Sequence, residues 1–550
     1  MAPFEVLAKE AMGRLGKLEI NGKQLITPNI LPVVHPKWQF ISPMEMHDRF
    51  GVDAIFTNAY IIFKDDKLRP AVVEKGLHAY LDFPGIIATD SGAFQHYMYG
   101  TDDLKADEIE PFQEAIGSDL GVILDQPVQI DDPRAVAAAK VMTTIQRARD
   151  NVERRASTKT GWYGPIHGSR FTDLLEQSAR SIGELDFAVH ALGGVVKLFN
   201  QYEFSMVARI VLAAKAFMDP SKPVHLFGAG HPMVFSLFVA LGCDLFDSAA
   251  YTLFAKEGRY ITASGTWLLD HLTEFPCSCP VCIDYTPAEM LAAPEQERTR
   301  LLSEHNLHVT MEELRIIREH MRAESLWQLV ETRCKAHPKL LEALRVAQAC
   351  GLGELVEEPV FKNRAIFYTG PETLQRPEVI HYRNYFMDRY EIPGDVSTII
   401  VVPELDVNAV ASPQHQKWLA IIDAACDGTH LKREDVVVTV LNPILGLIPE
   451  DLLHMYPLSH NVFPIVQDQD QHAMMDDALA RFVQRTDVAG KHVIVMIPDT
   501  FMAELGIEIA YDVTFLHQLV ERCNNLPGAN PLILVSTEHE LQEVLETMQG

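Results

Sequence analysis

The sequence predicts an α/β fold whose main part is a (β/α)8 TIM barrel. Between residues 30 and 247, eight short apolar runs rich in β-branched residues alternate with stretches of helical periodicity. Buried strands separated by helical crossovers are typical of this barrel. Several runs also end on a polar residue, where barrel enzymes carry their active sites. The eight runs are 30–34, 53–58, 85–90, 121–125, 162–167, 187–192, 223–227 and 243–247.

The composition limits the class of protein. The chain has 550 residues, 47% of them hydrophobic and 22% charged, which indicates a folded protein of more than one domain. Because we find no apolar run long enough to span a bilayer and no signal-peptide core at the start, we expect a cytoplasmic protein with no membrane partner. The net charge of −28 argues against a broadly basic nucleic-acid-binding surface. It leaves open a local phosphate-binding patch.

Ahead of the first expected strand, the segment LEINGKQLI contains Asn21-Gly22. This dipeptide between alternating residues is a strong signal for a two-residue β-hairpin. We expect the hairpin to close the bottom of the barrel.

Polar residues and glycines follow the expected strands, and in a barrel they would converge on one mouth. An aspartate after a strand often caps the next helix, but three of them in one barrel favour catalysis. Two carboxylates across such a mouth suit glycosidic-bond chemistry, in which one attacks the anomeric carbon and the other handles the leaving group's proton. Phe94 could stack on an aromatic base or belong to the core. The strand-end residues are Asn58, Asp90, Asp125, His167, Gly193, Gly194, Gly228, Gly230 and Asp247.

Three of the eight cysteines, Cys277, Cys279 and Cys282, lie within six residues. This spacing in a reducing compartment indicates a metal site rather than a disulfide framework. A tetrahedral zinc site needs a fourth ligand, and His305 and His308 are both available. A closed Cys3His site would hold one structural Zn2+ ion.

Basic residues that could bind phosphates follow the last strand. Lys256 and Arg259 come soon after Asp247, and Arg315, Arg318 and Arg322 share a face of an expected helix. Glutamates in that helix favour the alternative, a solvated charged face.

The second half predicts one or two further α/β domains. A helical stretch over 311–349 leads to a linker near 351–358, after which strands alternate with helices. We expect a barrel domain over 1–350 with its zinc subdomain at about 270–325. A first C-terminal domain over 351–430 and a second α/β domain over 431–550 would follow.

Several motifs together resemble the archaeal tRNA-guanine transglycosylases, which act at position 15 of tRNA in the archaeosine pathway. They cover most of residues 15–325, and one further motif extends the likeness into the second half. The motifs are FTNAYII (56–62), TDSGAFQ (89–95), GSDLGVILD (117–125), GGVV (193–196), HLFGAGHPM (225–233), CDLFDSAAY (243–251), PCSCPVC (276–282) and FYTGPETLQRPEV (367–379).

The resemblance implies a pentosyltransferase that exchanges a D-loop guanine of tRNA for 7-cyano-7-deazaguanine. Asp247 matches the family's nucleophile, which forms a covalent intermediate with the ribose, and Asp90 matches its general acid/base. The base-binding positions match Asp125, Ser91, Phe94, Gly194 and Val195. The zinc ligands match Cys277, Cys279, Cys282 and His305, because the family's histidine precedes an asparagine as His305 does. We also expect a homodimer.

Two features depart from the family's pattern. His167-Gly168 stands where the family usually has Gln-Gly, so the choice or affinity of the base could differ. We also find no convincing PUA segment, the small RNA-binding domain common in the archaeal family. Docking of tRNA would then rely on other surfaces of the chain or on a separate PUA-type subunit.

Two other kinds of function stay open. A related 7-deazaguanine enzyme is the first, either the archaeosine synthase paralogue or a transglycosylase acting on DNA. The paralogue's Pro-Cys-x-x-Lys-Pro-Tyr signature is absent from the sequence, which disfavours it. A non-catalytic tRNA-binding subunit is the second, and the intact Asp90, Asp125 and Asp247 argue against it.

Overall fold

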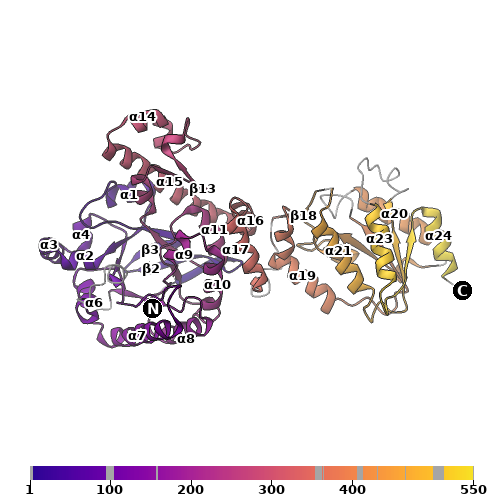
Figure 1. The fold of residues 1–550 in the computed structure, drawn as a ribbon. Helices are drawn as coiled ribbons and strands as arrows, with labels where there is room; N and C mark the ends of the chain where they lie inside the picture. Colours follow the sequence, from indigo (N-terminus) through magenta and orange to yellow (C-terminus); the bar gives the residue numbers. More distant parts are fainter. Residues whose placement is uncertain are drawn as a thin grey trace. The chain divides into compact units, whose positions relative to one another are not determined.

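A computed structural model of the chain divides into two compact units, Met1–Cys350 and Gly351–Gly550 (Figure 1). The structure describes residues 4–93, 104–156, 159–352, 362, 364–404, 413–429, 431–464, 466–498 and 513–548.

The first unit contains the predicted barrel. Eight parallel strands lie in chain order in one sheet. A bridge between Val33 and Phe56 joins the two edges of this sheet. The backbone N–H of Val34 donates to the Phe56 carbonyl at 2.8 Å, which closes the ring. The fold-class prediction is therefore confirmed. The strands are β4 (Asn29–Pro32), β5 (Ala54–Asn58), β6 (Ile86–Asp90), β7 (Leu120–Val122), β8 (Gly161–Ile166), β9 (Val189–Leu192), β10 (Val224–Leu226) and β11 (Leu245–Ser248).

Helices connect these strands and ring the barrel (Figure 1). Pro232–Ala240 (α11) is buried along its whole length, whereas Arg134–Arg154 (α7) buries one face. The remaining helices between strands are α1 (Pro43–Phe50), α2 (Ala59–Lys64), α3 (Leu68–Lys75), α4 (Leu77–Leu81), α6 (Ala106–Ala115), α8 (Thr172–Gly183), α9 (Val196–Asn200), α10 (Phe204–Lys215) and α12 (Ala250–Lys256).

An antiparallel sheet closes the bottom of the barrel. It consists of β1 (Phe4–Glu10), β2 (Gly13–Ile20) and β3 (Lys23–Thr27). Asn21 and Gly22 have φ of 52° and 76°, the left-handed conformation that a tight hairpin turn needs. Leu18, Ile20 and Leu25 pack against inward-facing barrel residues. The hairpin thus lies where the sequence led us to expect it.

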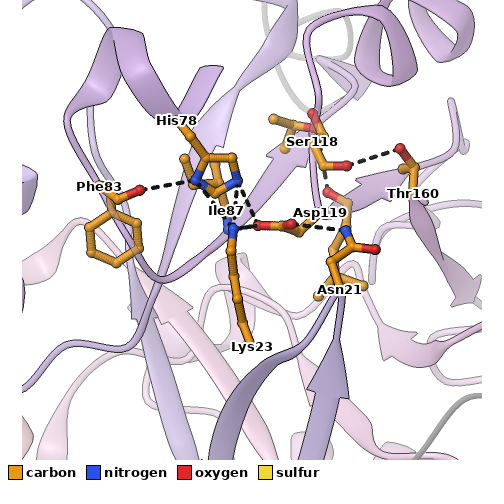
Figure 2. A network of polar contacts seen from close by, with 10 residues as sticks. Asn21, Lys23, His78, Phe83, Ile87, Ser118, Asp119 and Thr160 are labelled. Carbon is orange, nitrogen blue, oxygen red and sulfur yellow. Dashed lines mark hydrogen bonds and ion pairs between the residues drawn. The ribbon is translucent and has the colours of Figure 1, made fainter. Parts of the chain in front are cut away.

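A buried carboxylate, Asp119, ties this hairpin to the barrel (Figure 2). It immediately precedes β7 and accepts hydrogen bonds from Lys23 Nζ at 2.8 Å and Asn21 Nδ2 at 3.0 Å. His78 Nε2 lies 2.8 Å from the same carboxylate, and the Ile87 backbone N–H donates to it at 2.9 Å. Burial acts to raise the pKa of Asp119, but these hydrogen bonds outweigh it and lower the pKa to about 2.

Replacing Asp119 with asparagine should therefore destabilise the first unit. A folded pKa of about 2 against an ordinary value of 3.8 corresponds to about 2.5 kcal/mol of unfolding free energy. This stability is present above the ordinary pKa and is lost as the pH falls through the folded value. Thermal unfolding should show a deficit at pH 7 that disappears toward pH 2. The exposed, ion-paired Asp173 offers the control, Asp173→Asn. Equal melting temperatures of the two variants at pH 7 would contradict the role of Asp119.

A small subdomain follows the barrel's last helix. Its core includes Tyr260, Leu269, Val281, Met290 and Leu302. It is built on a helix of 28 residues, Glu295–Arg322 (α15), whose buried face includes His305 and Asn306. The other elements of this part are β12 (Arg259–Thr262), β13 (Gly265–Leu268), η1 (Leu269–His271), α13 (Pro280–Asp284), α14 (Pro287–Ala292), α16 (Leu326–Cys334) and α17 (Pro338–Ala349). None of the helices in the described part of the chain has the length and apolar character of a membrane span.

The second unit is built on one five-stranded sheet, in the order β17 (Gly446–Pro449), β16 (Val436–Asn442), β15 (Thr398–Pro403), β19 (His492–Met496) and β20 (Leu532–Val535). The strands β15 and β16 pair in parallel, on either side of the boundary that we expected at residues 430 and 431. Because one core also runs from Ile366 to Leu545, residues 351–550 form one unit here rather than two. The expected domain boundary lies between two strands that are neighbours in the same sheet.

The elements of the second unit follow the predicted alternation of strands and helices. They are β14 (Ile366–Phe367), η2 (Pro371–Gln375), α19 (Pro377–Asp388), β15 (Thr398–Pro403), α20 (Pro413–Asp427), η4 (Arg433–Asp435), β16 (Val436–Asn442), β17 (Gly446–Pro449), η5 (Glu450–Leu452), β18 (Asn461–Val462), α21 (Gln469–Phe482), β19 (His492–Met496), α23 (Val513–Asn524), β20 (Leu532–Val535) and α24 (Glu538–Thr547).

Candidate active site and metal site

A cavity of about 710 Å³ lies at the carboxyl ends of the barrel strands. Ligands of barrel enzymes bind at this end, because the loops after the strands converge there. The cavity wall brings together most of the polar residues and glycines that we expect at the strand ends. These are Asn58, Asp90, Asp125, His167, Gly193, Gly194, Gly228 and Asp247.

Asp247 lies in β11 and is held by two donors. Its Oδ1 accepts a hydrogen bond from the Gly228 backbone N–H at 2.9 Å and lies 3.1 Å from His225 Nε2. Gly228 has φ of 74°, so the turn that aims this N–H favours glycine. Two groups bonded to one carboxylate oxygen fix the orientation of Asp247, as an attacking carboxylate requires.

A buried chain of polar groups lies beneath Asp247. His225 Nδ1 is 3.2 Å from the hydroxyl of Tyr163, and both side chains are buried inside the barrel. Burial, with the nearby Asp247 charge, raises the pKa of Tyr163 well above its ordinary value. A neutral Tyr163 hydroxyl donating to Nδ1 leaves the imidazole proton on Nε2, where it bonds to Asp247. We infer that this chain fixes the orientation of Asp247.

Asp90 ends β6 in a different environment. Asn58 Nδ2 donates to its Oδ2 at 2.9 Å, and the backbone N–H groups of Ser91 and Gly92 also bond to it. Burial, together with the charges of Asp125 and Asp247, raises the pKa of Asp90 to about 7. Asp90 can therefore both donate and accept a proton near neutral pH.

Asp125 and His167, which follow the neighbouring strands β7 and β8, form a buried pair at the mouth. His167 Nε2 lies 2.6 Å from Asp125 Oδ2. His167 Nδ1 is buried and has no hydrogen-bond partner among the described residues. His167 lines the cavity, although its side chain is almost completely buried.

The glycine pair after β9 lets two loops approach each other closely. Gly194 has φ of 78°, and a Cβ there would lie 2.3 Å from the carbonyl oxygen of Val128, which follows Asp125 in the chain. A Cβ on Gly193 would lie 2.6 Å from His167 Cε1. Larger residues at these positions would displace the loop or the imidazole.

Two of the expected base-binding residues do not line the cavity. The Ser91 hydroxyl is buried and donates to the carbonyl of Ile123 at 3.1 Å, which braces the loop that carries Asp125. Val195 is also buried, next to the start of α9. Phe94 lies outside the described residues.

The structure adds residues to which sequence reasoning gave no role. The sequence indicates Asn58 only as a strand end, and it gives Tyr163 and His225 no role. Both of the latter stand in otherwise apolar strands, at positions that face the barrel interior. A polar residue at an inward position of an apolar run is the signal that could have revealed them.

The predicted metal ligands also come together. The sulfur atoms of Cys277, Cys279 and Cys282 and a ring nitrogen of His305 all lie within 4.8 Å of one another. Such spacing fits four ligands around a single ion, since a Zn–S bond is about 2.3 Å long. The cluster can therefore hold a metal ion.

Contacts around His305 orient it toward the cysteines. Its Nε2 lies 2.9 Å from the Ile261 carbonyl, which leaves Nδ1 facing Cys279 Sγ at 3.5 Å and Cys282 Sγ at 3.3 Å. A second bond of this kind is typical of metal-ligating histidines. His308 instead packs against Phe50, with ring centroids 4.4 Å apart, and does not belong to the cluster.

Of the five basic residues considered as phosphate ligands, only Lys256 lines the cavity among the described residues. Arg259 lies over the Phe254 ring, and Arg322 pairs with Glu319. Arg318 donates to the Pro28 carbonyl at 2.7 Å. The shared helical face of Arg315, Arg318 and Arg322 is thus not part of this mouth.

Comparisons with known proteins agree with this site. The family model described as queuine tRNA-ribosyltransferase matches residues 9–339. A protein of Methanococcus maripaludis (strain C7) named tRNA-guanine(15) transglycosylase is 41% identical over 474 residues, covering 84% of this chain and 70% of its own length. One of the same name from Methanocaldococcus jannaschii is 41% identical over 478 residues, covering 85% and 70%. Another, from Pyrococcus abyssi, is 46% identical over 381 residues, covering 69% and 64%.

Proposed function

The chain belongs to the queuine tRNA-ribosyltransferase family, the tRNA-guanine transglycosylases, and from this we propose that it exchanges guanine-15 of tRNA for 7-cyano-7-deazaguanine in archaeosine biosynthesis. The observation that carries the proposal is the pair of carboxyl groups at the mouth. The Gly228 N–H and His225 Nε2 hold one carboxylate oxygen of Asp247, whereas Asp90 is buried and its pKa is raised to about 7. Unlike environments for two carboxyl groups suit a division into nucleophile and acid/base.

In the proposed reaction the target nucleotide turns out of the RNA stack into the cavity. The Asp247 carboxylate attacks the ribose C1′ while the bond from C1′ to guanine breaks. Protonated Asp90 gives its proton to the departing guanine, which would otherwise leave as an unstable anion. The covalent intermediate keeps the RNA strand intact. Asp90 then takes a proton from the incoming base, whose nitrogen attacks C1′ and releases Asp247.

Asp125 and His167 are the proposed readers of the base. The Asp125 carboxylate can accept hydrogen bonds from ring and amino N–H groups of a guanine-like base. His167, whose Nδ1 has no partner among the described residues, stands where the resemblance leads us to expect a glutamine. The imidazole presents one nitrogen, whereas a glutamine amide presents both a donor and an acceptor.

Replacing His167 with glutamine should preserve base exchange but change the affinity for the base. We expect the KM for guanine to shift by about 10-fold, because one hydrogen bond to the base is made differently. Steady-state kinetics with varied guanine at saturating tRNA measures this shift. Complete loss of exchange in a folded His167→Gln protein would contradict the assignment of this position to base binding.

We also propose that the Cys3His cluster holds a structural zinc ion. The three thiolates and Nδ1 of His305 would fill all four positions of a tetrahedral ion, so it would stabilise the subdomain and take no part in the reaction. The hydrogen bond from His305 to the Ile261 carbonyl supports the fit, because it directs Nδ1 toward the sulfur atoms.

A homodimer and a separate PUA-type subunit stay predictions, and light scattering of the purified protein tests the dimer.

Incorporation of labelled guanine tests the proposed function. The protein is incubated with radiolabelled guanine and one of three acceptors, which are a tRNA transcript, the same transcript with adenine at position 15, and duplex DNA. Label in the first alone, which unlabelled 7-cyano-7-deazaguanine then chases out, is the expected result. Label in DNA alone would indicate a DNA transglycosylase. No label in any acceptor would indicate a non-catalytic subunit or the synthase paralogue.

A further inference from the structure

Lys256, the last residue of α12, carries its ammonium group at the wall of the cavity among aromatic rings. Its Nζ lies 4.0 Å from the centroid of the Trp38 ring and 5.7 Å from that of Phe40. The Trp38 ring in turn stacks on His35, with centroids 4.9 Å apart. Aromatic faces attract a cation without neutralising it. Trp38 and Phe40 form an aromatic cradle for this ammonium group. The cradle holds a positive charge at the end of α12, the helix that follows the strand of Asp247.

Lys256 differs from the neighbouring lysines in its partners. Lys197, which also lines the cavity, pairs with Asp131, and Lys37 pairs with Asp65. Among the described residues, no carboxylate lies within ion-pair distance of Lys256, although the chain has a net charge of −28. A cation held by rings rather than by a carboxylate stays available to an anionic ligand.

The carboxylates that line the cavity make a cation at its wall favourable for binding a polynucleotide. Asp125 and Asp247 face the same cavity and would repel the phosphate groups of any polynucleotide that enters it. A free base carries no phosphate and meets no such repulsion. A positive charge at the wall would therefore aid the binding of the polynucleotide but not of the base.

We propose that Lys256, held by Trp38 and Phe40, binds a backbone phosphate next to the nucleotide whose base is exchanged. The inference rests on the proposed function, because it takes the phosphodiester to be that of the tRNA substrate. Trp38 and Phe40 act through Lys256 and are positioning residues. Such a contact fixes the position of the RNA strand relative to Asp247 and carries no sequence information.

Binding of tRNA measured without catalysis tests the proposal. Fluorescence anisotropy of labelled tRNA is followed across a range of salt concentrations for the wild type and for Lys256→Gln, Lys256→Arg and Trp38→Leu. The control is Lys339→Gln, because exposed Lys339 pairs with Glu342 and does not line the cavity. Steady-state kinetics with tRNA or guanine varied completes the comparison.

We expect Lys256→Gln to weaken tRNA binding about 10-fold and to lower the slope of log Kd against log salt by about 0.7 to 0.9. Arginine should restore the slope. Trp38→Leu should weaken binding about threefold with the slope retained, because the charge remains but is no longer held. The KM for guanine should not move in these variants.

A Lys256→Gln protein that matches the Lys339→Gln control in both affinity and slope would overturn the proposal. So would a lower kcat with unchanged tRNA affinity, since that would place Lys256 in the chemistry. The anisotropy does not depend on base exchange, so failure of the proposed function would show instead as tRNA binding without guanine incorporation.

Discussion

Replacing Asp247 with asparagine should abolish guanine exchange, with a fall in kcat of more than about 10⁴-fold, as expected for removal of a nucleophile. The asparagine amide oxygen can still accept hydrogen bonds from the Gly228 N–H and from His225 Nε2. The fold and the cavity should therefore persist while the group that attacks C1′ is lost. Incorporation of labelled guanine into tRNA measures the change.

The control variant is Asp131→Asn, because Asp131 is an exposed aspartate that pairs with Lys197. It should keep near wild-type exchange. Asp247→Asn should still bind tRNA and unfold at a temperature close to that of the wild type. If the Asp247→Asn protein exchanges guanine within about tenfold of the wild-type rate, Asp247 is not the nucleophile.

Replacing Asp90 with asparagine should lower exchange by about 10²- to 10⁴-fold, the range for loss of a general acid/base. The same change should raise the melting temperature at pH 8. In the folded wild type burial and the charges of Asp125 and Asp247 raise the pKa of Asp90 to about 7, against an ordinary value of 3.8. The folded state alone holds this proton between about pH 4 and 7, so unfolding free energy falls as pH rises through that interval.

The pH dependence separates this account from a purely structural role. Asparagine carries no charge, so Asp90→Asn and wild type should melt together near pH 4 and diverge by about 2 °C or more at pH 8. In wild type the kcat/KM for tRNA should fall as the pH rises above about 7, because departing guanine needs the protonated acid. An asparagine variant that is less stable than wild type at pH 8 would contradict the raised pKa.

The sequence predicted the barrel and the ends of its strands because the information is local. Each strand is a short apolar run, and Asp90 and Asp247 follow directly from where two runs end. The three cysteines of the metal cluster lie within six residues, so their proximity needed no fold. The choice of His305 over His308 came from the family resemblance.

What the sequence could not provide depends on contacts between distant segments. The chain from Tyr163 through His225 to Asp247 crosses three strands, and its existence depends on the barrel register. The aromatic cradle likewise joins Trp38 to Lys256, more than two hundred residues apart. The expected boundary at residue 430 failed for a related reason, because strand pairing across it is not visible in local composition.

Mapping the covalent intermediate tests the central claim most directly. Protein and tRNA are mixed without free base and denatured, and the RNA-linked peptide is identified by mass spectrometry after nuclease and protease digestion. The account predicts one ribose adduct, on the peptide that contains Asp247, and none in the Asp247→Asn protein. An adduct on Asp90 or Asp125, or exchange that proceeds with no adduct in the wild type, would contradict it.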